Sequence, residues 1–266
     1  MSVTPSVRLP AGFRAAGVTA GLKASGTPDL ALVVNDGPDH HAAAVFTSNR
    51  VEAAPVTWSR QVVVDGRVDA VVLNSGGANA CTGAQGFLDT HRTAEHVATT
   101  LGISAGDVVV CSTGLIGELL PMDKVTAGVD AAAAALSPDG HEEAAVAIKT
   151  TDTVHKVASH AGEGWSVSGM AKGAGMLAPA LATMLVVLTT DAVVDAADLD
   201  PATLDVTMNG VQVCRAGGVG DDRSLVDLTG REVHVVVDLH AGPESATVWT
   251  NDLTHDYVHE NSAYST

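Results

Sequence analysis

The sequence predicts a mixed α and β protein, because two kinds of segment alternate along it. Short runs rich in Val, Ile and Thr are broken by Gly, Asn and Asp, which is the pattern of strands joined by turns. Between them lie a few longer segments of helical composition, one of which contains a run of alanines. With 266 residues, the chain can bury a hydrophobic core without needing disulfides or a structural metal.

The expected strands are the short β-rich runs. Their Val, Ile and Thr side chains suit the half-buried, pleated surface of a sheet. In chain order, the predicted strands cover residues 30–34, 43–46, 61–64, 70–73, 108–111, 165–170, 183–189, 233–237 and 246–249.

Three segments are expected to be helices, because Pro, Gly, Ser or Asp nearby provides start and stop signals. They cover residues 85–101, 122–136 and 141–148, and the alanine run lies in the second. Residues 191–201, Asp-Ala-Val-Val-Asp-Ala-Ala-Asp-Leu-Asp-Pro, form an acidic connector after a strongly apolar strand. This connector is the one place where the predicted order of strands and helices is interrupted.

The charge balance argues against a polyanionic partner. The chain has 31 acidic and 14 basic side chains, and its formal net charge is −17. Proteins that bind nucleic acid usually present a stripe of Lys and Arg, whereas these residues are sparse and scattered along this sequence. We therefore expect no nucleic acid among its partners.

Three features favour a cytoplasmic protein. Cys81, Cys111 and Cys214 are odd in number and far apart, which suits reduced thiols, and we expect Cys81 and Cys111 to be buried rather than nucleophilic. The first eight residues lack the basic-then-apolar design of a signal peptide. The longest apolar stretch, 176–188, contains Pro179 and is shorter than the roughly 20 residues that cross a bilayer, so no membrane span is expected.

Lys172 stands in a glycine-rich stretch, Gly169-Met-Ala-Lys-Gly-Ala-Gly-Met-Leu-Ala-Pro179, where backbone N–H groups can approach an anion. A nucleotide-binding loop is excluded, because it would need Gly-Lys-Ser/Thr leading into a helix, and apolar residues and a proline follow here. Taken alone, the stretch is more simply interpreted as a glycine-rich turn between two strands.

His255 and His259 have the spacing of the two histidines in a zinc-binding helix. Asp256 is shorter than the usual Glu base, and almost no chain remains to supply a third ligand. Two histidines on a polar tail are usually just solvated. We therefore expect no metal site.

Two short motifs follow predicted strands with small, turn-prone residues. They are Asn74-Ser-Gly-Gly-Ala-Asn79 and Ser112-Thr-Gly-Leu-Ile-Gly117. Such turns can leave backbone N–H groups pointing outward, which is a common way to build an anion site or an oxyanion hole. Either motif alone is more often a plain turn.

Taken together and in order, these segments resemble the ornithine acetyltransferase (glutamate N-acetyltransferase) family of arginine biosynthesis. The most specific segment is Met170-Ala-Lys-Gly-Ala-Gly-Met-Leu-Ala-Pro179 running into Ala182-Thr-Met-Leu185. The other matching segments are Val45-Phe-Thr-Ser-Asn-Arg50, Asn74-Ser-Gly-Gly-Ala-Asn-Ala-Cys-Thr-Gly83, Ser112-Thr-Gly-Leu-Ile-Gly117, Lys149-Thr-Thr-Asp-Thr153 and Asn261-Ser-Ala-Tyr-Ser-Thr266.

The resemblance implies a self-cleaving fold of layered β-sheets with flanking helices, in which an N-terminal threonine is the nucleophile. The bond from Ala182 to Thr183 would be cut, giving an alpha chain of residues 1–182 and a beta chain of residues 183–266. Two copies of each chain would form a heterotetramer. No metal or cofactor is implied.

The resemblance also assigns roles to individual residues. Thr183 would be the nucleophile, and Thr113 and Gly114 would form the oxyanion hole. The residues that contact substrate would be Thr150, Lys172, Thr183, Asn261 and Thr266. By a ping-pong mechanism, acetyl would pass from N2-acetyl-L-ornithine to Thr183 and then to L-glutamate, with acetyl-CoA as an alternative donor.

Elementary chemistry agrees with these roles. A threonine hydroxyl is a weak nucleophile and needs a base beside it. Once the preceding peptide bond is cut, Thr183 carries its own α-amino group, whose reference pKa of about 7.7–8.0 suits proton transfer near neutrality.

The chain departs from the family near residues 191–204. There it lacks a long segment that carries the family's substrate-binding Glu, so that Glu is assigned to no residue here. Two alternatives to the acetyltransferase follow: a truncated homologue without activity, or a related self-cleaving aminopeptidase or amidohydrolase in which water is the acceptor.

Overall fold

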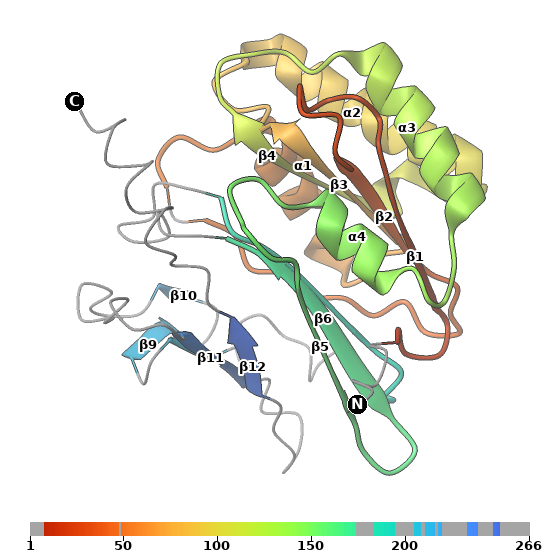
Figure 1. The fold of residues 1–266 in the computed structure, drawn as a ribbon, viewed down its shortest axis with the longest axis vertical. Coiled ribbons are helices and arrows are strands. Elements are labelled where there is room, and N and C mark those ends of the chain that lie inside the picture. The colour runs from red at the N-terminus through yellow and green to blue at the C-terminus, as the bar shows by residue number, and fades with distance from the viewer. Residues whose placement is uncertain are drawn as a thin grey trace.

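The computed structural model describes residues 8–47, 49–173, 183–194, 205–208, 211–215, 218–219, 233–238 and 247–250. It is a layered α/β fold, as predicted, with helices packed on a central sheet (Figure 1). The helices are α1 (Ala54–Val62), α2 (Gly83–Leu101), α3 (Met122–Ala135) and α4 (His141–Ala147), with short 3-10 turns at Val63–Asp65 and Ala105–Asp107.

The central sheet has four strands in the order β1 (Phe13–Val18), β2 (Leu30–Asn35), β3 (Ala70–Gly77) and β4 (Val108–Leu115). The first three strands run antiparallel, whereas β3 and β4 are parallel and are connected through α2. Because β3 and β4 are parallel, their carboxyl ends meet at one edge of the sheet. The motifs that follow these two strands therefore lie side by side.

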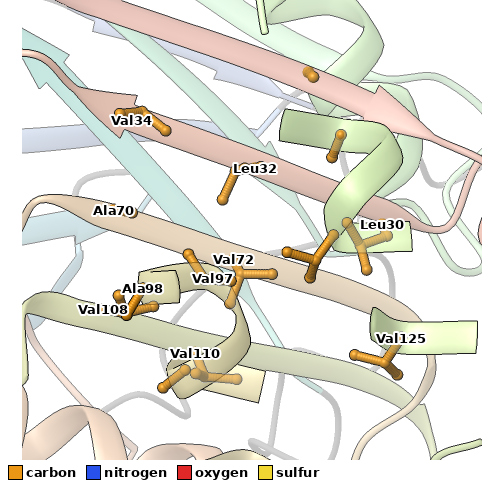
Figure 2. Packing of buried hydrophobic residues seen from close by; sticks show 14 of the residues in the cluster. Leu30, Leu32, Val34, Ala70, Val72, Val97, Ala98, Val108, Val110 and Val125 are labelled. Carbon is orange, nitrogen blue, oxygen red and sulfur yellow. The ribbon is translucent and has the colours of Figure 1, made fainter. Parts of the chain in front are cut away.

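Both faces of this sheet are covered, which explains why β2 reads as a continuous apolar run. Leu30, Leu32 and Val34 pack against α2 and α3 on one face, and Figure 2 shows this cluster with Val97 and Val125 from those helices. The alternate residues of β2 pack on the other face against α4 and a second sheet.

The second sheet consists of β5 (Lys156–Ala161), β6 (Ser166–Lys172) and β7 (Leu185–Thr190), all antiparallel. In Figure 1, β5 and β6 form a long ribbon beside α4. Lys172, the last residue of β6, pairs with Leu185, the first residue of β7. The register therefore places Lys172 and the residues just before β7 at the same end of the sheet.

A third sheet lies toward the end of the chain. Its strands, in spatial order, are β10 (Gly218–Val219), β9 (Val211–Arg215), β8 (Asp205–Met208), β11 (Val233–Asp238) and β12 (Thr247–Thr250). Every pairing in it is antiparallel.

Most predicted elements are confirmed within a few residues, and two predicted strands are wrong. Residues 61–64 complete α1 and enter a 3-10 turn, because Pro55 near the helix start and packing on β4 outweigh the local valines. Residues 43–46 form no strand. The sequence analysis also missed β1, β5, β8, β9 and β10. In β1 and β5, the Ala, Gly, Ser and charged residues have weak strand propensity.

The strand predicted at 183–189 begins two residues later, so Thr183 and Met184 precede β7 rather than open it. In the part of the chain that the structure describes, no helix is long and apolar enough to cross a membrane.

Candidate active site

One side of the candidate site is built by close packing of glycine backbones. Thr113 and Gly114 lie near the end of β4, opposite Ser75 and Gly76 of β3. Gly114 has a φ of +126°, and a Cβ placed there would lie 2.7 Å from the carbonyl carbon of Gly76. Gly76 in turn has a φ of +141° and packs against Leu22. Only glycine allows these three backbone segments to approach so closely.

Side-chain hydrogen bonds fix the same edge. The Asn74 amide donates to the carbonyl of Gly77 at 2.9 Å, and the Ser112 hydroxyl donates to Asn74 Oδ1 at 2.5 Å. The two motifs after β3 and β4 are also joined by backbone hydrogen bonds, from Ala78 N to Leu115 O and from Gly117 N to Ala80 O. They are therefore one composite turn, in which Thr113 is buried and Gly114 is exposed.

Lys172 connects this turn to the second sheet. Its side chain is only 4% exposed, and Nζ donates to the carbonyl oxygen of Thr183 at 3.1 Å and to Thr113 Oγ1 at 3.4 Å. Burial lowers the pKa of Lys172, and although the charge of Asp152 opposes this, the charge of Lys156 adds to it. The structure thus brings together three residues that the sequence analysis singled out far apart in the chain.

A buried ion pair holds the backbone next to Lys172. Lys156 Nζ lies 2.5 Å from Asp152 Oδ1, and both side chains are buried. The same carboxylate oxygen accepts a hydrogen bond from Gly173 N at 2.8 Å, while Lys156 donates to Gly173 O at 3.1 Å. Both polar groups of Gly173 are therefore held by this pair.

Thr150 joins the cluster through the same carboxylate, because its backbone N–H donates to Asp152 Oδ2 at 3.2 Å. Burial alone would raise the pKa of Asp152, but the hydrogen bonds from Lys156 and Gly173 and the charges of Lys156 and Lys172 outweigh it and lower the pKa. Asp152 is therefore an ionised carboxylate at neutral pH.

Sequence reasoning did not single out Asp152 and Lys156. Asp152 lies within the segment Lys149-Thr-Thr-Asp-Thr153, which was noted for its resemblance, but no pattern marked its side chain. Lys156 lies between the predicted helix at 141–148 and the predicted strand at 165–170, and no sequence motif marked it.

Other sequence-predicted residues lie outside the described residues, namely Ala182, His255, His259, Asn261 and Thr266. Among the cysteines, Cys81 is exposed, because it sits in the loop before α2, so the expectation of a buried thiol was wrong there. Cys111 is partly buried, and desolvation raises its pKa to about 12, which keeps the thiol protonated and unreactive. In the described ranges, no group of three or more His, Cys, Asp or Glu could hold a metal ion.

The chain is similar to known proteins along most of its length. The model of the ArgJ family matches residues 14–203 and 196–266. The arginine biosynthesis bifunctional protein ArgJ of Streptomyces coelicolor is 47% identical over 381 aligned positions, which cover 98% of this chain and 100% of the relative. The protein of the same name from Mycobacterium leprae is 62% identical over 204 residues, covering 74% of this chain and 50% of the relative.

Two solved structures share the fold. The crystal structure of the ornithine acetyltransferase from Mycobacterium tuberculosis, complexed with ornithine, matches with a TM-score of 0.63 and 58% identity, covering 66% of this chain and 94% of that chain. ArgJ of Bacillus halodurans matches with a TM-score of 0.56 and 33% identity, covering 68% and 95%. The resemblance inferred from the motifs is thus confirmed, and the chain belongs to the ArgJ family of arginine-biosynthesis acetyltransferases.

Proposed function

We propose that this chain transfers acetyl from N2-acetyl-L-ornithine to L-glutamate by a ping-pong mechanism in which Thr183 carries the acetyl group. The observation that carries the proposal is the position of Lys172, whose Nζ lies within hydrogen-bonding distance of both Thr183 O and Thr113 Oγ1. This contact joins the expected nucleophile to the expected oxyanion hole.

Self-cleavage is the first step of the proposal. The hydroxyl of Thr183 attacks the carbonyl carbon of Ala182, the C–N bond between the two residues breaks, and an ester forms. Water then hydrolyses the ester, which leaves residues 1–182 with a carboxyl end and Thr183 with a free α-amino group. This amino group is the base that activates the hydroxyl afterwards.

Transfer follows in two half-reactions. The hydroxyl of Thr183 attacks the acetyl carbonyl of N2-acetylornithine, passes its proton to the α-amino group, and forms an acetyl ester as ornithine leaves with that proton. The amine of glutamate then attacks the ester and regenerates the hydroxyl. Each half-reaction passes through an oxyanion, and a donor at Thr113 or Gly114 would lower each barrier by about 3 kcal/mol.

The sizes of the related chains support a cut in this family. Two thirds of the present chain already make up 94% of the crystallised M. tuberculosis chain, so that chain is shorter than this one. In the M. leprae relative, 204 aligned residues are only half of the length. The crystallised chain thus has the size of one piece of a longer relative, as a cut between 182 and 183 requires.

The same comparisons support a missing segment in this chain. The S. coelicolor alignment has 381 positions, more than the 266 residues present here, although it covers nearly the whole of both proteins. The two matches to the family model also overlap over residues 196–203, at the end of the acidic connector. This observation favours the second candidate, a truncated homologue without transfer activity.

Intact mass and N-terminal sequencing test the self-cleavage. We expect two pieces, 1–182 and 183–266, with Thr183 at the new N-terminus, and a single uncut chain for Thr183→Ala. Wild-type protein that stays uncut, like the variant, would overturn this step. Native mass of the cut protein tests the proposed heterotetramer of two alpha and two beta chains.

Acetyl transfer from N2-acetylornithine to glutamate separates the two candidates. We expect turnover well above that of Thr183→Ala, whereas cut protein with no more activity than the variant would identify the inactive homologue. Release of ornithine that continues without glutamate would indicate a hydrolase. Replacing N2-acetylornithine by acetyl-CoA tests the second donor.

A further inference from the structure

Two charged side chains that have no role in the proposed reaction hold the residue that opens the segment to be cut. Asp152 Oδ1 accepts the N–H of Gly173 at 2.8 Å, and Lys156 Nζ donates to the carbonyl oxygen of Gly173 at 3.1 Å. The side chains of Lys156 and Asp152 are 6% and 0% exposed. We call these two residues the Gly173 clamp.

The segment that contains the proposed cut is held at both of its ends. Residues 174–182 join Gly173 to Thr183. The clamp holds the first end. At the second end, Lys172 Nζ donates to the carbonyl oxygen of Thr183 at 3.1 Å, and Lys172 itself pairs with Leu185 across β6 and β7. The two ends therefore meet at one corner of the second sheet.

The covalent connection between these ends is too long to fix them. A chain of this length can extend over roughly 35 Å, whereas paired strands lie only about 5 Å apart. Attack by the Thr183 hydroxyl on the carbonyl carbon of Ala182 requires the reacting atoms to approach within roughly 3–3.5 Å. The start of the segment must therefore be fixed by other contacts, and the clamp supplies them at Gly173.

A buried ion pair is a costly way to hold a backbone. Pairing two buried charges often fails to repay their loss of hydration, so apolar side chains of similar volume would stabilise the fold as well or better. Apolar side chains, however, cannot bind the N–H and the carbonyl oxygen of Gly173. What the charges of Asp152 and Lys156 add is therefore the position of this backbone rather than stability.

We propose that the Gly173 clamp positions the chain for self-cleavage and is needed far less for acetyl transfer. This inference rests on the proposed function and assigns positioning residues to its first step. Before the cut, the place of Gly173 constrains the path of the chain to Ala182. After the cut, Thr183 is no longer joined to that chain, and the hydrogen bond from Lys172 and the pairing of β7 with β6 hold it instead.

Two double variants that differ at one position test the clamp. Asp152→Leu/Lys156→Met and Asp152→Asn/Lys156→Met both remove the buried charges, but only the asparagine keeps an oxygen that can accept the N–H of Gly173. Time courses of intact mass measure the cut. We expect the leucine variant to be cut roughly 10²-fold more slowly than wild type, and the asparagine variant to recover much of that rate. Equal rates in the two variants would overturn the proposal.

Stability is measured separately, because a poorly folded chain would also be cut slowly. Urea denaturation of both double variants in a Thr183→Ala background compares their folds without the proposed cut. We expect the leucine variant to be at least as stable as the asparagine variant, because it buries no polar group at position 152, although it is cut more slowly. A leucine variant that is both less stable and cut more slowly would make the clamp merely structural and overturn the proposal.

Transfer activity provides the second contrast. The rate of acetyl transfer from N2-acetylornithine to glutamate, divided by the amount of the piece 183–266, gives kcat for the cut molecules alone. We expect kcat of the leucine variant to fall far less than its rate of cutting, because Thr183 is then held without the clamp. Equal losses in the two rates would overturn the proposal.

Cutting is measured without substrate, which separates this inference from the proposed function. If the wild type is cut but transfers no acetyl, the proposed transfer fails, and slow cutting of the leucine variant with recovery in the asparagine variant still supports the clamp. If the leucine variant is cut as fast as wild type, the clamp alone is overturned. Wild-type protein that is never cut overturns the self-cleavage and the clamp together.

Discussion

The two sides of the candidate active site are built from different physical interactions. On the β3–β4 side, the backbones of Gly76 and Gly114 touch, and position depends on the absence of side chains. On the β6 side, Gly173 and Lys172 are held by buried charges, chiefly Asp152 and Lys156. The first arrangement is sensitive to any added atom but indifferent to pH, whereas the second tolerates small changes of shape but depends on protonation.

This difference assigns different tasks to the two sides. A shape-determined turn keeps its donors in place while charge develops on the substrate, which is what an oxyanion hole requires. A charge-determined corner holds a buried lysine beside Thr183, the proposed nucleophile. Substitutions that affect one kind of interaction and not the other test the contrast directly.

Breaking the ion pair should have the largest effect. Lys156→Met leaves the buried charge of Asp152 without its partner, which typically lowers the free energy of unfolding by about 3–5 kcal/mol. Urea denaturation measures the change. The double variant Asp152→Leu/Lys156→Met removes both charges and should recover much of the loss, whereas a single variant within about 1 kcal/mol of wild type would contradict the role of the pair.

Gly114→Ala should affect the other side by steric clash. Its Cβ would lie 2.7 Å from Gly76, so the two strands must separate and the oxyanion donors move. We expect acetyl transfer to fall by roughly 10²–10³-fold, as when an oxyanion donor is lost. Gly117→Ala is the control, because Gly117 also has a positive φ but its Cβ would meet open space. Equal losses in both variants would show that backbone strain, and not the clash, is responsible.

The pH dependence of stability should follow the charged side. The pKa of Lys172 is lower in the folded protein than its ordinary value of 10.5, so the unfolded chain binds more protons between the two values and stability rises with pH there. The cost of the buried charge is present in full below the folded pKa. We therefore expect Lys172→Met to be more stable than wild type at neutral pH, and this difference to shrink as the pH approaches 10.5. The urea midpoints of the two proteins measure the difference.

The stability contribution of Asp152 also rises with pH, in a more acidic range, but here the ionised form is the stabilising one. Its folded pKa is lower than 3.8, so its contribution is complete above that value and is lost as the pH falls through the folded pKa. The loss of activity in Gly114→Ala should have no such dependence on pH beyond that of the wild type. A clash effect that changed with pH would show that the two sides are coupled.

The sequence predicted the shape-determined side better than the charged side. The strands 70–73 and 108–111 and the glycine motifs after them are local patterns, and both appear in the structure as β3, β4 and one composite turn. The contact of Lys172 with Thr113 joins residues 59 positions apart, and no local pattern encodes it. Only the family resemblance placed these two residues in one site.

Charge along the sequence was also misleading in one respect. The lysines are scattered in the chain, and the net charge of −17 described the surface as a whole. The fold nevertheless brings Lys156 and Lys172 to one site, because the start of β5 and the end of β6 pair there. Clustering of this kind depends on tertiary packing, and neither composition nor spacing reports it.

The smallest expected effect concerns strand β7, which begins two residues after Thr183. Val186 is 44% exposed, and Met184 and Leu188 are exposed to a similar degree, whereas Val187 is partly buried and packs against the core. Val186→Thr should change the free energy of unfolding by less than about 0.5 kcal/mol. Val187→Thr puts a hydroxyl among apolar side chains and should cost about 1–3 kcal/mol. If urea denaturation gives equal losses for the two variants, another part of the molecule or a second copy covers this face of β7 in solution. Strand β7 would then be as enclosed as the central sheet.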